Sequence, residues 1–173
     1  MAADKPYAVG IDPGLKGAVV ALTREGRLHT YWDMPVCSPT RGRKMRQVDA
    51  HAFKHIVAQA QRAGAQTWAI EAPQFIGMAP FSQASLNRQF GLLLGVVIGR
   101  GADVRAVAPR TWRRGLVEGK KPTKAQIMAQ AAERWPNLPL KSSSRARSNN
   151  MDGRAEAAFL ALHALRVSGK DVT

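Results

Sequence analysis

Three short apolar runs separated by tight turns open the chain, and they constrain its fold more than any other feature. The runs cover residues 7–11, 17–23 and 28–32, with Asp12-Pro13-Gly14 and Arg24-Glu25-Gly26 between them. Apolar runs of this length, bounded by Asp, Pro and Gly, are typical of strands joined by turns. The pattern therefore predicts an antiparallel meander of three strands.

A helical crossover follows the meander. Asp49 is a suitable N-cap for a helix over residues 50–63, and Gly64 ends that helix. The next strand covers residues 66–71. Because a helix leads to it, this strand can run parallel to the first one.

After residue 71, the sequence predicts further helices and one more strand, with two long loops in the whole chain. Residues 34–46 and 136–150 lack periodicity, so both segments are interpreted as flexible basic loops. The remaining expected elements are a helix over 82–99 capped by Ser82, a strand over 104–108, and helices over 109–112, 123–135 and 151–167. The order predicts one α/β domain spanning residues 1–173. Its five-stranded mixed sheet, three antiparallel strands and then two parallel ones, has helices on both faces. This pattern resembles the ribonuclease H-like fold.

The net charge and the composition limit the classes of function that this chain can have. The chain has 26 Lys and Arg against 12 Asp and Glu, a net charge of +14, which favours a polyanionic partner such as nucleic acid. The alternative is that the charge only aids solubility. The single cysteine, Cys37, excludes a disulfide framework and a multi-cysteine zinc site. No apolar run approaches the roughly 20 residues of a membrane span, and the first residues lack a signal-like apolar segment. We therefore expect an intracellular protein that is not secreted and does not bind membranes.

Four carboxylates stand in unusual places. Asp12 and Glu71 each follow an apolar strand directly, whereas Asp152 and Glu156 lie four residues apart at the start of the last helix. If the first and fourth strands are parallel, Asp12 and Glu71 project from the same end of the sheet. The helical spacing places Asp152 and Glu156 on one helix face. Each acid alone also has a structural explanation, as a turn residue, a strand end, an N-cap or a first-turn acid.

Carboxylates gathered at one point repel one another unless a cation lies between them. A set of oxygen ligands favours Mg²⁺ or Mn²⁺ over zinc. Two such ions, about 3.5–4 Å apart, can clamp a phosphodiester and activate water. An acidic metal pocket within a basic surface is what hydrolysis of a polyanion requires.

These residues resemble a known family. Gly10-Ile11-Asp12-Pro13-Gly14 resembles the opening motif of RuvC-type Holliday junction resolvases, and Ala69-Ile70-Glu71 resembles their second motif. Lys124-Ala125-Gln126 is similar to the start of their penultimate helix, and residues 152–161 to their terminal acidic helix. The divergence, the small size and the Asp-Gly-Arg-Ala-Glu sequence of the last motif resemble a phage-type member more than the housekeeping enzyme. The resemblance therefore implies a cytoplasmic location, in a bacterial or phage-infected host cell.

The resemblance implies a homodimer that nicks opposed strands of four-way DNA symmetrically with two divalent metal ions and no organic cofactor. It implies Asp12, Glu71, Asp152 and Glu156 as metal ligands and Lys124 as a catalytic residue near the scissile phosphate. It also implies a wedge residue in the loop after Glu71, for which Phe75 is the first candidate and Met78 and Phe81 are the next ones. The last two acids lie four residues apart where the family usually has three, and both spacings keep the two side chains on one helix face.

Basic residues cluster near these motifs and are candidates for contacts with DNA phosphates. With Phe75, the candidate DNA-binding residues are Arg41, Arg43, Lys44, Arg110, Arg113, Arg114, Lys120, Lys121, Lys124, Arg145 and Arg147. Two other functions remain open. One is a nuclease of the same fold that acts on RNA, an RNA–DNA hybrid or other DNA, and the other is a junction-binding protein without catalysis.

Overall fold

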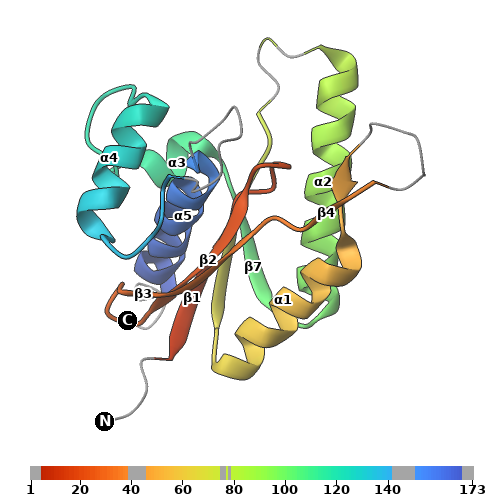
Figure 1. The fold of residues 1–173 in the computed structure, drawn as a ribbon, viewed down its shortest axis with the longest axis horizontal. Helices are drawn as coiled ribbons and strands as arrows, with labels where there is room; N and C mark the ends of the chain where they lie inside the picture. Colours follow the sequence, from red (N-terminus) through yellow and green to blue (C-terminus); the bar gives the residue numbers. More distant parts are fainter. Residues whose placement is uncertain (1–4, 39–45, 75–76, 78, 142–150, 169–173) are drawn as a thin grey trace.

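A five-stranded mixed sheet forms the centre of the protein (Figure 1). The computed structural model describes residues 5–38, 46–74, 77, 79–141 and 151–168. The strands of the sheet are β1 (Pro6–Ile11), β2 (Ala18–Thr23), β3 (Leu28–Asp33), β6 (Thr67–Glu71) and β7 (Asp103–Val107). They lie in the order β3-β2-β1-β6-β7. The first three are antiparallel, and β6 and β7 run parallel to β1, which confirms the predicted sheet.

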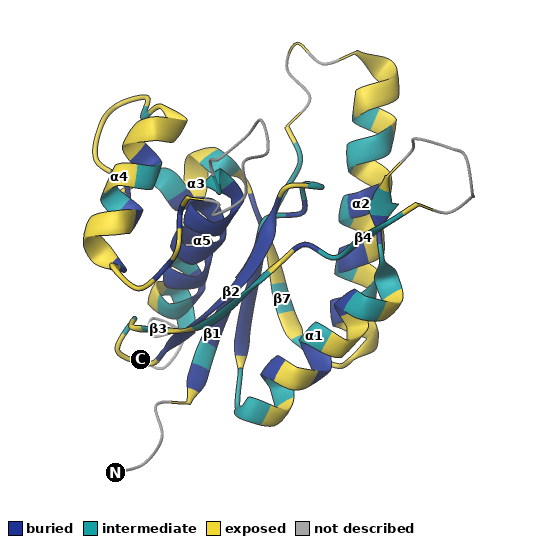
Figure 2. Cartoon of the chain, viewed as in Figure 1, coloured by how far each residue is buried: buried dark blue, intermediate teal, exposed yellow. Residues whose placement is uncertain are grey.

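Helices cover both faces of this sheet (Figure 1). The helices are α1 (Ala50–Ala63), α2 (Pro80–Gly99), α3 (Pro109–Arg113), α4 (Lys124–Arg134) and α5 (Asp152–Ser168). One core cluster joins the sheet to α1 and α2, and a second joins it to α3, α4 and α5. Figure 2 shows that α5 and the central strands form the most deeply buried part. Within the described residues, no helix has both the length and the apolarity needed to cross a membrane.

Local capping signals set several of the predicted boundaries. The Asp49 side chain accepts hydrogen bonds from the first turn of α1, and Gly64 ends that helix with φ of 119°. Thr123 and Gln126 form a reciprocal capping box at α4. The predicted Ser82 cap is wrong, because α2 begins at Pro80, whose fixed φ suits the first turn of a helix.

Both predicted flexible loops contain ordered structure. Within and just after residues 34–46, β4 (Val36–Cys37) and β5 (Gln47–Val48) pair as a small antiparallel ribbon. At the start of residues 136–150, Leu138 and Leu140 are buried in the core beside α5. The flexible interpretation is therefore wrong for these stretches, because isolated apolar side chains anchor them without any periodic pattern. The rest of both loops, residues 39–45 and 142–150, lies outside the described residues.

A partly buried ion pair fixes α5 to the sheet edge. The Arg154 guanidinium donates to both carboxylate oxygens of Asp33 at 2.6 and 2.7 Å and to the Pro139 carbonyl oxygen at 2.6 Å. It also lies over the Tyr31 ring, 4.4 Å from the centroid. The Arg154 side chain is 9% exposed, so its charge depends on Asp33 for compensation.

We expect Asp33→Asn to lower the free energy of unfolding by about 2 kcal/mol, because it leaves a buried guanidinium without its counter-charge. Glu25→Gln is the matched control, since the Glu25–Arg27 pair is 57% and 60% exposed. The control should change stability by less than about 0.5 kcal/mol. Urea unfolding of both variants measures the difference, and equal losses would mean that the buried pair does not anchor α5.

Candidate active site

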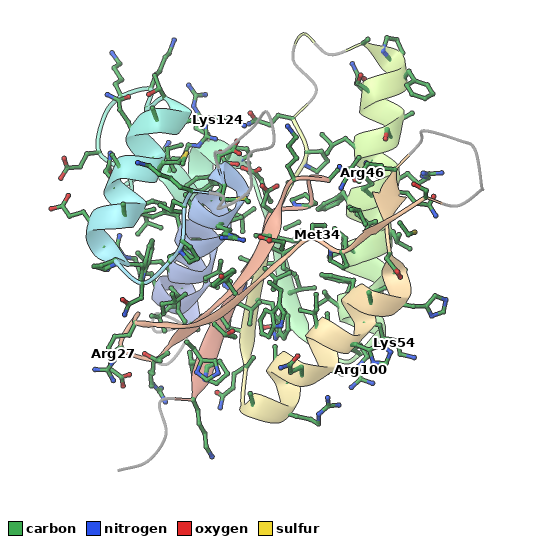
Figure 3. All side chains as sticks on the ribbon, in the orientation of Figure 1. Arg27, Met34, Arg46, Lys54, Arg100 and Lys124 are labelled. Atoms are coloured by element: carbon green, nitrogen blue, oxygen red, sulfur yellow. The ribbon has the colours of Figure 1, made fainter. Side chains whose placement is uncertain are left out.

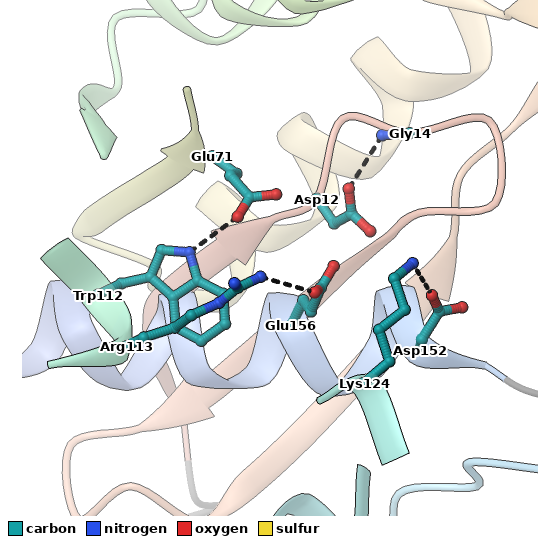
Figure 4. Close-up of polar contacts among 8 residues, drawn as sticks. All are labelled: Asp12, Gly14, Glu71, Trp112, Arg113, Lys124, Asp152 and Glu156. Carbon is teal, nitrogen blue, oxygen red and sulfur yellow. Dashed lines mark hydrogen bonds and ion pairs between the residues drawn. The ribbon is translucent and has the colours of Figure 1, made fainter. Parts of the chain in front are cut away.

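Three carboxylates from distant parts of the chain meet at one end of the sheet (Figure 4). Asp12 follows β1, Glu71 ends β6, and Glu156 lies in the first turns of α5. One carboxylate oxygen from each lies within 4.8 Å of the others. The parallel register of β1 and β6, which pairs Ile11 with Ile70, brings Asp12 beside Glu71. We call these three residues the carboxylate cluster.

The turn after β1 holds Asp12 in place. Its Oδ1 accepts a hydrogen bond from the Gly14 backbone N–H at 3.0 Å, and its own N–H donates to the Ala18 carbonyl oxygen. The start of α5 approaches this turn closely at Gly153. A Cβ atom there would lie 2.5 Å from the Lys16 carbonyl oxygen and 2.9 Å from Asp12 Oδ2. The absence of a side chain at Gly153 therefore allows the helix that carries Glu156 to reach Asp12.

The short helix α3 supplies two partners that sequence reasoning did not assign to the cluster. The Trp112 indole Nε1–H donates to Glu71 Oε1 at 2.9 Å. The Arg113 guanidinium donates from Nη2 to Glu156 Oε1 at 3.2 Å. Arg113 was predicted only as a DNA contact. The available sequence signal was a tryptophan flanked by arginines on a predicted short helix. That signal does not say which carboxylates the two side chains contact.

Asp152 has a different partner. Its carboxylate accepts a hydrogen bond from Lys124 Nζ, and the two form an ion pair. Among the described residues, the group close enough to share one cation contains Asp12, Glu71 and Glu156 and does not contain Asp152. Asp152 as a metal ligand stays a prediction. The pairing does bring Lys124 to the edge of the site, as Figure 4 shows.

Burial and mutual repulsion perturb the acids of the cluster. Burial, with repulsion from Glu156 and Glu71, raises the pKa of Asp12 to about 8. Burial and repulsion from Glu156 raise the pKa of Glu71 to about 7, although the Trp112 hydrogen bond acts in the opposite direction. Burial also raises the pKa of Glu156, against the effect of Lys124 and Arg113. At neutral pH the cluster therefore lacks the positive charge that would keep all three carboxylates ionised.

The residues present fit a hard divalent cation. The donor set consists of carboxylate oxygens, as Mg²⁺ and Mn²⁺ prefer. A cation bound among these acids would oppose the rise in pKa that burial and mutual repulsion cause, since opposite charge nearby favours the ionised form. Asp12, Glu71 and Glu156 could thus hold such an ion.

This electrostatic arrangement predicts a pH-dependent stability. When folding raises the pKa of a carboxyl group, the folded protein binds more protons than the unfolded chain at pH values between the two pKa values. The free energy of unfolding therefore falls as the pH rises from the unfolded-state pKa to the folded-state pKa. With the pKa of Asp12 at about 8 and that of Glu71 at about 7, we expect the cation-free protein to lose about 2–3 kcal/mol between pH 6.5 and 8.5. Burial lowers the pKa of His163 from its ordinary value, so its contribution lies below this window.

Thermal unfolding in EDTA across this range measures the effect, and Mg²⁺ should raise the melting temperature more at pH 8.5 than at pH 6.5. Asp12→Asn should flatten the pH dependence. A wild-type stability that rises with pH over this range would contradict the assignment.

An open pocket of about 510 Å³ lies beside the cluster. Its walls come from the turn after β1, the N-terminal half of α2, and the starts of α4 and α5. They include Asp12, Lys16, Phe81, Lys124 and Glu156. Phe81 is 75% exposed. Of the wedge candidates, Phe75 and Met78 lie outside the described residues, and Phe81 lies beside the site.

The predicted DNA-binding residues that can be placed lie on α3, the following loop and the start of α4. Arg110, Arg114, Lys120, Lys121 and Lys124 are exposed. Figure 3 shows Lys124 and Arg46 toward the end of the sheet that carries the cluster, with Arg27, Lys54 and Arg100 toward the opposite end. The other predicted contacts, Arg41, Arg43, Lys44, Arg145 and Arg147, lie outside the described residues.

Comparison with known proteins shows the fold. No family profile matches the sequence, and no curated protein matches it. RuvC of Thermus thermophilus is similar in structure, with a TM-score of 0.53, 15% identity, and coverage of 94% of this chain and 95% of RuvC. The same protein in complex with a Holliday junction substrate gives a TM-score of 0.55 at 17% identity, covering 94% of each chain. The yeast mitochondrial Holliday junction resolvase Ydc2 gives 0.51 at 13% identity, covering 98% of this chain and 82% of Ydc2. The predicted RuvC-type, ribonuclease H-like fold is confirmed.

Proposed function

We propose that this protein is a divalent-metal-dependent endonuclease that resolves four-way DNA junctions by paired, symmetric nicking. The observation that carries the proposal is the carboxylate cluster at the ends of two parallel strands, beside an open pocket in a strongly basic chain. The fold shared with RuvC and Ydc2 supports the choice of a four-way junction over other nucleic acids.

Each residue has a role in this mechanism. Asp12, Glu71 and Glu156 would hold the cation, with Asp152 as a fourth acid that separates from Lys124 if a second ion binds. When bound, divalent ions lower the pKa of water and stabilise the leaving oxygen of a phosphodiester. Lys124 places a positive charge beside the pocket, where it can hold a non-bridging phosphate oxygen.

The direct test is cleavage of a labelled synthetic four-way junction with Mg²⁺ or Mn²⁺, beside linear duplex and an RNA–DNA hybrid. The proposal expects paired nicks at symmetric positions on the junction alone. Cleavage of the hybrid without junction preference would point to an RNA-directed nuclease. Tight junction binding without nicks in either metal would point to a binding protein.

A homodimer belongs to this proposal, because symmetric nicking needs two sites. Exposed apolar side chains on α2, with Leu92 40% and Ile98 57% exposed, support a second copy packing there. Sedimentation equilibrium of the protein tests the dimer, which should have twice the chain mass of 18.8 kDa.

Junction affinity should fall steeply with salt if the basic surface holds phosphates. Six or more phosphate contacts predict a loss of about 1,000-fold between about 50 and 200 mM salt, through release of counterions from the DNA. A binding titration at four salt concentrations measures the slope. Replacing exposed Lys120 and Lys121 by Ala should make that slope shallower, and an unchanged slope would remove this loop from the interface.

A further inference from the structure

The buried indole of Trp112 links the carboxylate cluster to the protein core. The residue is fully buried, and its ring stacks on Phe159 of α5 with centroids 6.3 Å apart and planes 14° from parallel. The Nε1–H group at its edge donates to Glu71 Oε1 at 2.9 Å. Because packing fixes the ring, the N–H donor is held in one direction.

This hydrogen bond gives the two carboxylate oxygens of Glu71 different surroundings. Oε1 is occupied by the indole, while Figure 4 shows the second oxygen turned toward Asp12. A glutamate has several rotatable bonds and would otherwise sample many orientations at a strand end. The indole therefore selects the orientation in which the second oxygen faces the other carboxylates.

Arg113, the residue after Trp112, contacts Glu156, another acid of the carboxylate cluster. Arg113 donates to Glu156 Oε1 at 3.2 Å, and its guanidinium carbon lies 5.0 Å from the centroid of the Trp112 ring. Two adjacent residues of α3 thus contact two members of the carboxylate cluster. The backbone is tied to the sheet close by, because the Ala72 N–H donates to the Val107 carbonyl oxygen just before α3.

We propose that Trp112 is a positioning residue that presets Glu71 for cation binding. The inference rests on the proposed metal site. It adds that Trp112 holds the Glu71 carboxylate in its binding orientation before DNA binds. Partners that orient a ligand in this way typically contribute 10–100-fold to metal affinity or activity. Loss of the indole donor should therefore weaken Mg²⁺ binding while the fold remains.

The first test is the indole N–H resonance of Trp112 in ¹⁵N-labelled wild-type protein during titration with Mg²⁺ alone. Mg²⁺ at Glu71 should shift this resonance. The Trp135 resonance is the internal control, because its Nε1–H donates to the Gly26 carbonyl oxygen at 2.9 Å, away from the cluster. This measurement needs no variant, so it holds even if substitution of Trp112 prevents folding.

The second test is calorimetric titration of Trp112→Phe and Trp135→Phe with Mg²⁺. The two tryptophans are matched, since both are buried and both pack on Phe159, Trp135 edge-to-face at 5.2 Å. We expect about a ten-fold weaker Mg²⁺ affinity for Trp112→Phe and an unchanged affinity for Trp135→Phe.

The outcomes separate this inference from the proposed function. Equal Mg²⁺ affinity of folded Trp112→Phe and wild type, or a stationary Trp112 resonance while Mg²⁺ binds, would overturn the positioning role and leave the metal site standing. Equal weakening in both variants would also overturn it, because the effect would then come from the core around Phe159. Failure of wild type to bind Mg²⁺ would overturn the proposed metal site as well.

Discussion

Asp12→Asn should reduce the rate of junction cleavage at least about 1,000-fold, equivalent to about 4 kcal/mol of transition-state stabilisation. The substitution removes the negative charge of one acid of the cluster. It keeps a side-chain oxygen that can accept the hydrogen bond from the Gly14 N–H. The loss therefore reports on cation binding, with the turn intact. Single-turnover cleavage with saturating enzyme and Mg²⁺ measures it.

Two further readouts exclude simple misfolding. Junction binding in EDTA should persist or tighten, because a negative charge beside the DNA has been removed. Stability at pH 8.5 without cation should increase, because folding no longer has to raise the pKa of this carboxyl group to about 8. Glu25→Gln, at an exposed acid away from the cluster, should cleave at the wild-type rate. If Asp12→Asn cleaved like wild type, Asp12 would not be a metal ligand.

Local chemistry explains why much of this fold can be predicted from sequence. The caps Asp49, Gly64 and Thr123 each contact residues within one helical turn. The residues that form each cap are therefore close together in the sequence, where they can be recognised. The position of Asp12 beside Glu71 was also predictable, because a helical crossover makes β1 and β6 parallel and brings their ends together. In each case the signal and its structural consequence lie within one supersecondary unit.

The contacts that complete the site join residues that are far apart in the sequence. Trp112 and Glu71 are 41 residues apart, as Arg113 and Glu156 are 43 apart, and Arg154 and Asp33 are 121 apart. Such pairs depend on how α3 and α5 rest on the sheet, which hydrophobic periodicity does not specify. The helical spacing placed Asp152 and Glu156 on one face, but the same spacing could not show that Lys124 pairs with Asp152.

Gly10→Ala should lower the free energy of unfolding by about 4 kcal/mol or more, the range reached by severe overpacking in a core. A Cβ atom at Gly10 would lie 2.0 Å from the Ala157 carbonyl oxygen and 2.3 Å from the Ala161 nitrogen. Both are backbone atoms of α5, so a side-chain rotation cannot relieve the clash. β1 cannot move away either, because it pairs with β2 on one side and β6 on the other.

Gly95→Ala is the matched control within one chain, because an added Cβ on this part of α2 meets open space there. Gly95 lies between Leu92 and Ile98 on the face proposed to hold a second copy, so both variants are compared at protein concentrations low enough to keep the protein monomeric. Gly95→Ala should stabilise the protein by about 0.5–1 kcal/mol, the usual gain from replacing glycine by alanine within a helix. Urea unfolding of the two variants should thus give changes of opposite sign, and a small loss for Gly10→Ala would contradict the close approach of α5 to β1. Any Gly10→Ala protein that does fold must have moved α5 away from the sheet. Because α5 carries Glu156 and β1 leads into Asp12, that protein should also have lost its affinity for Mg²⁺, which couples the packing of this helix to the proposed chemistry.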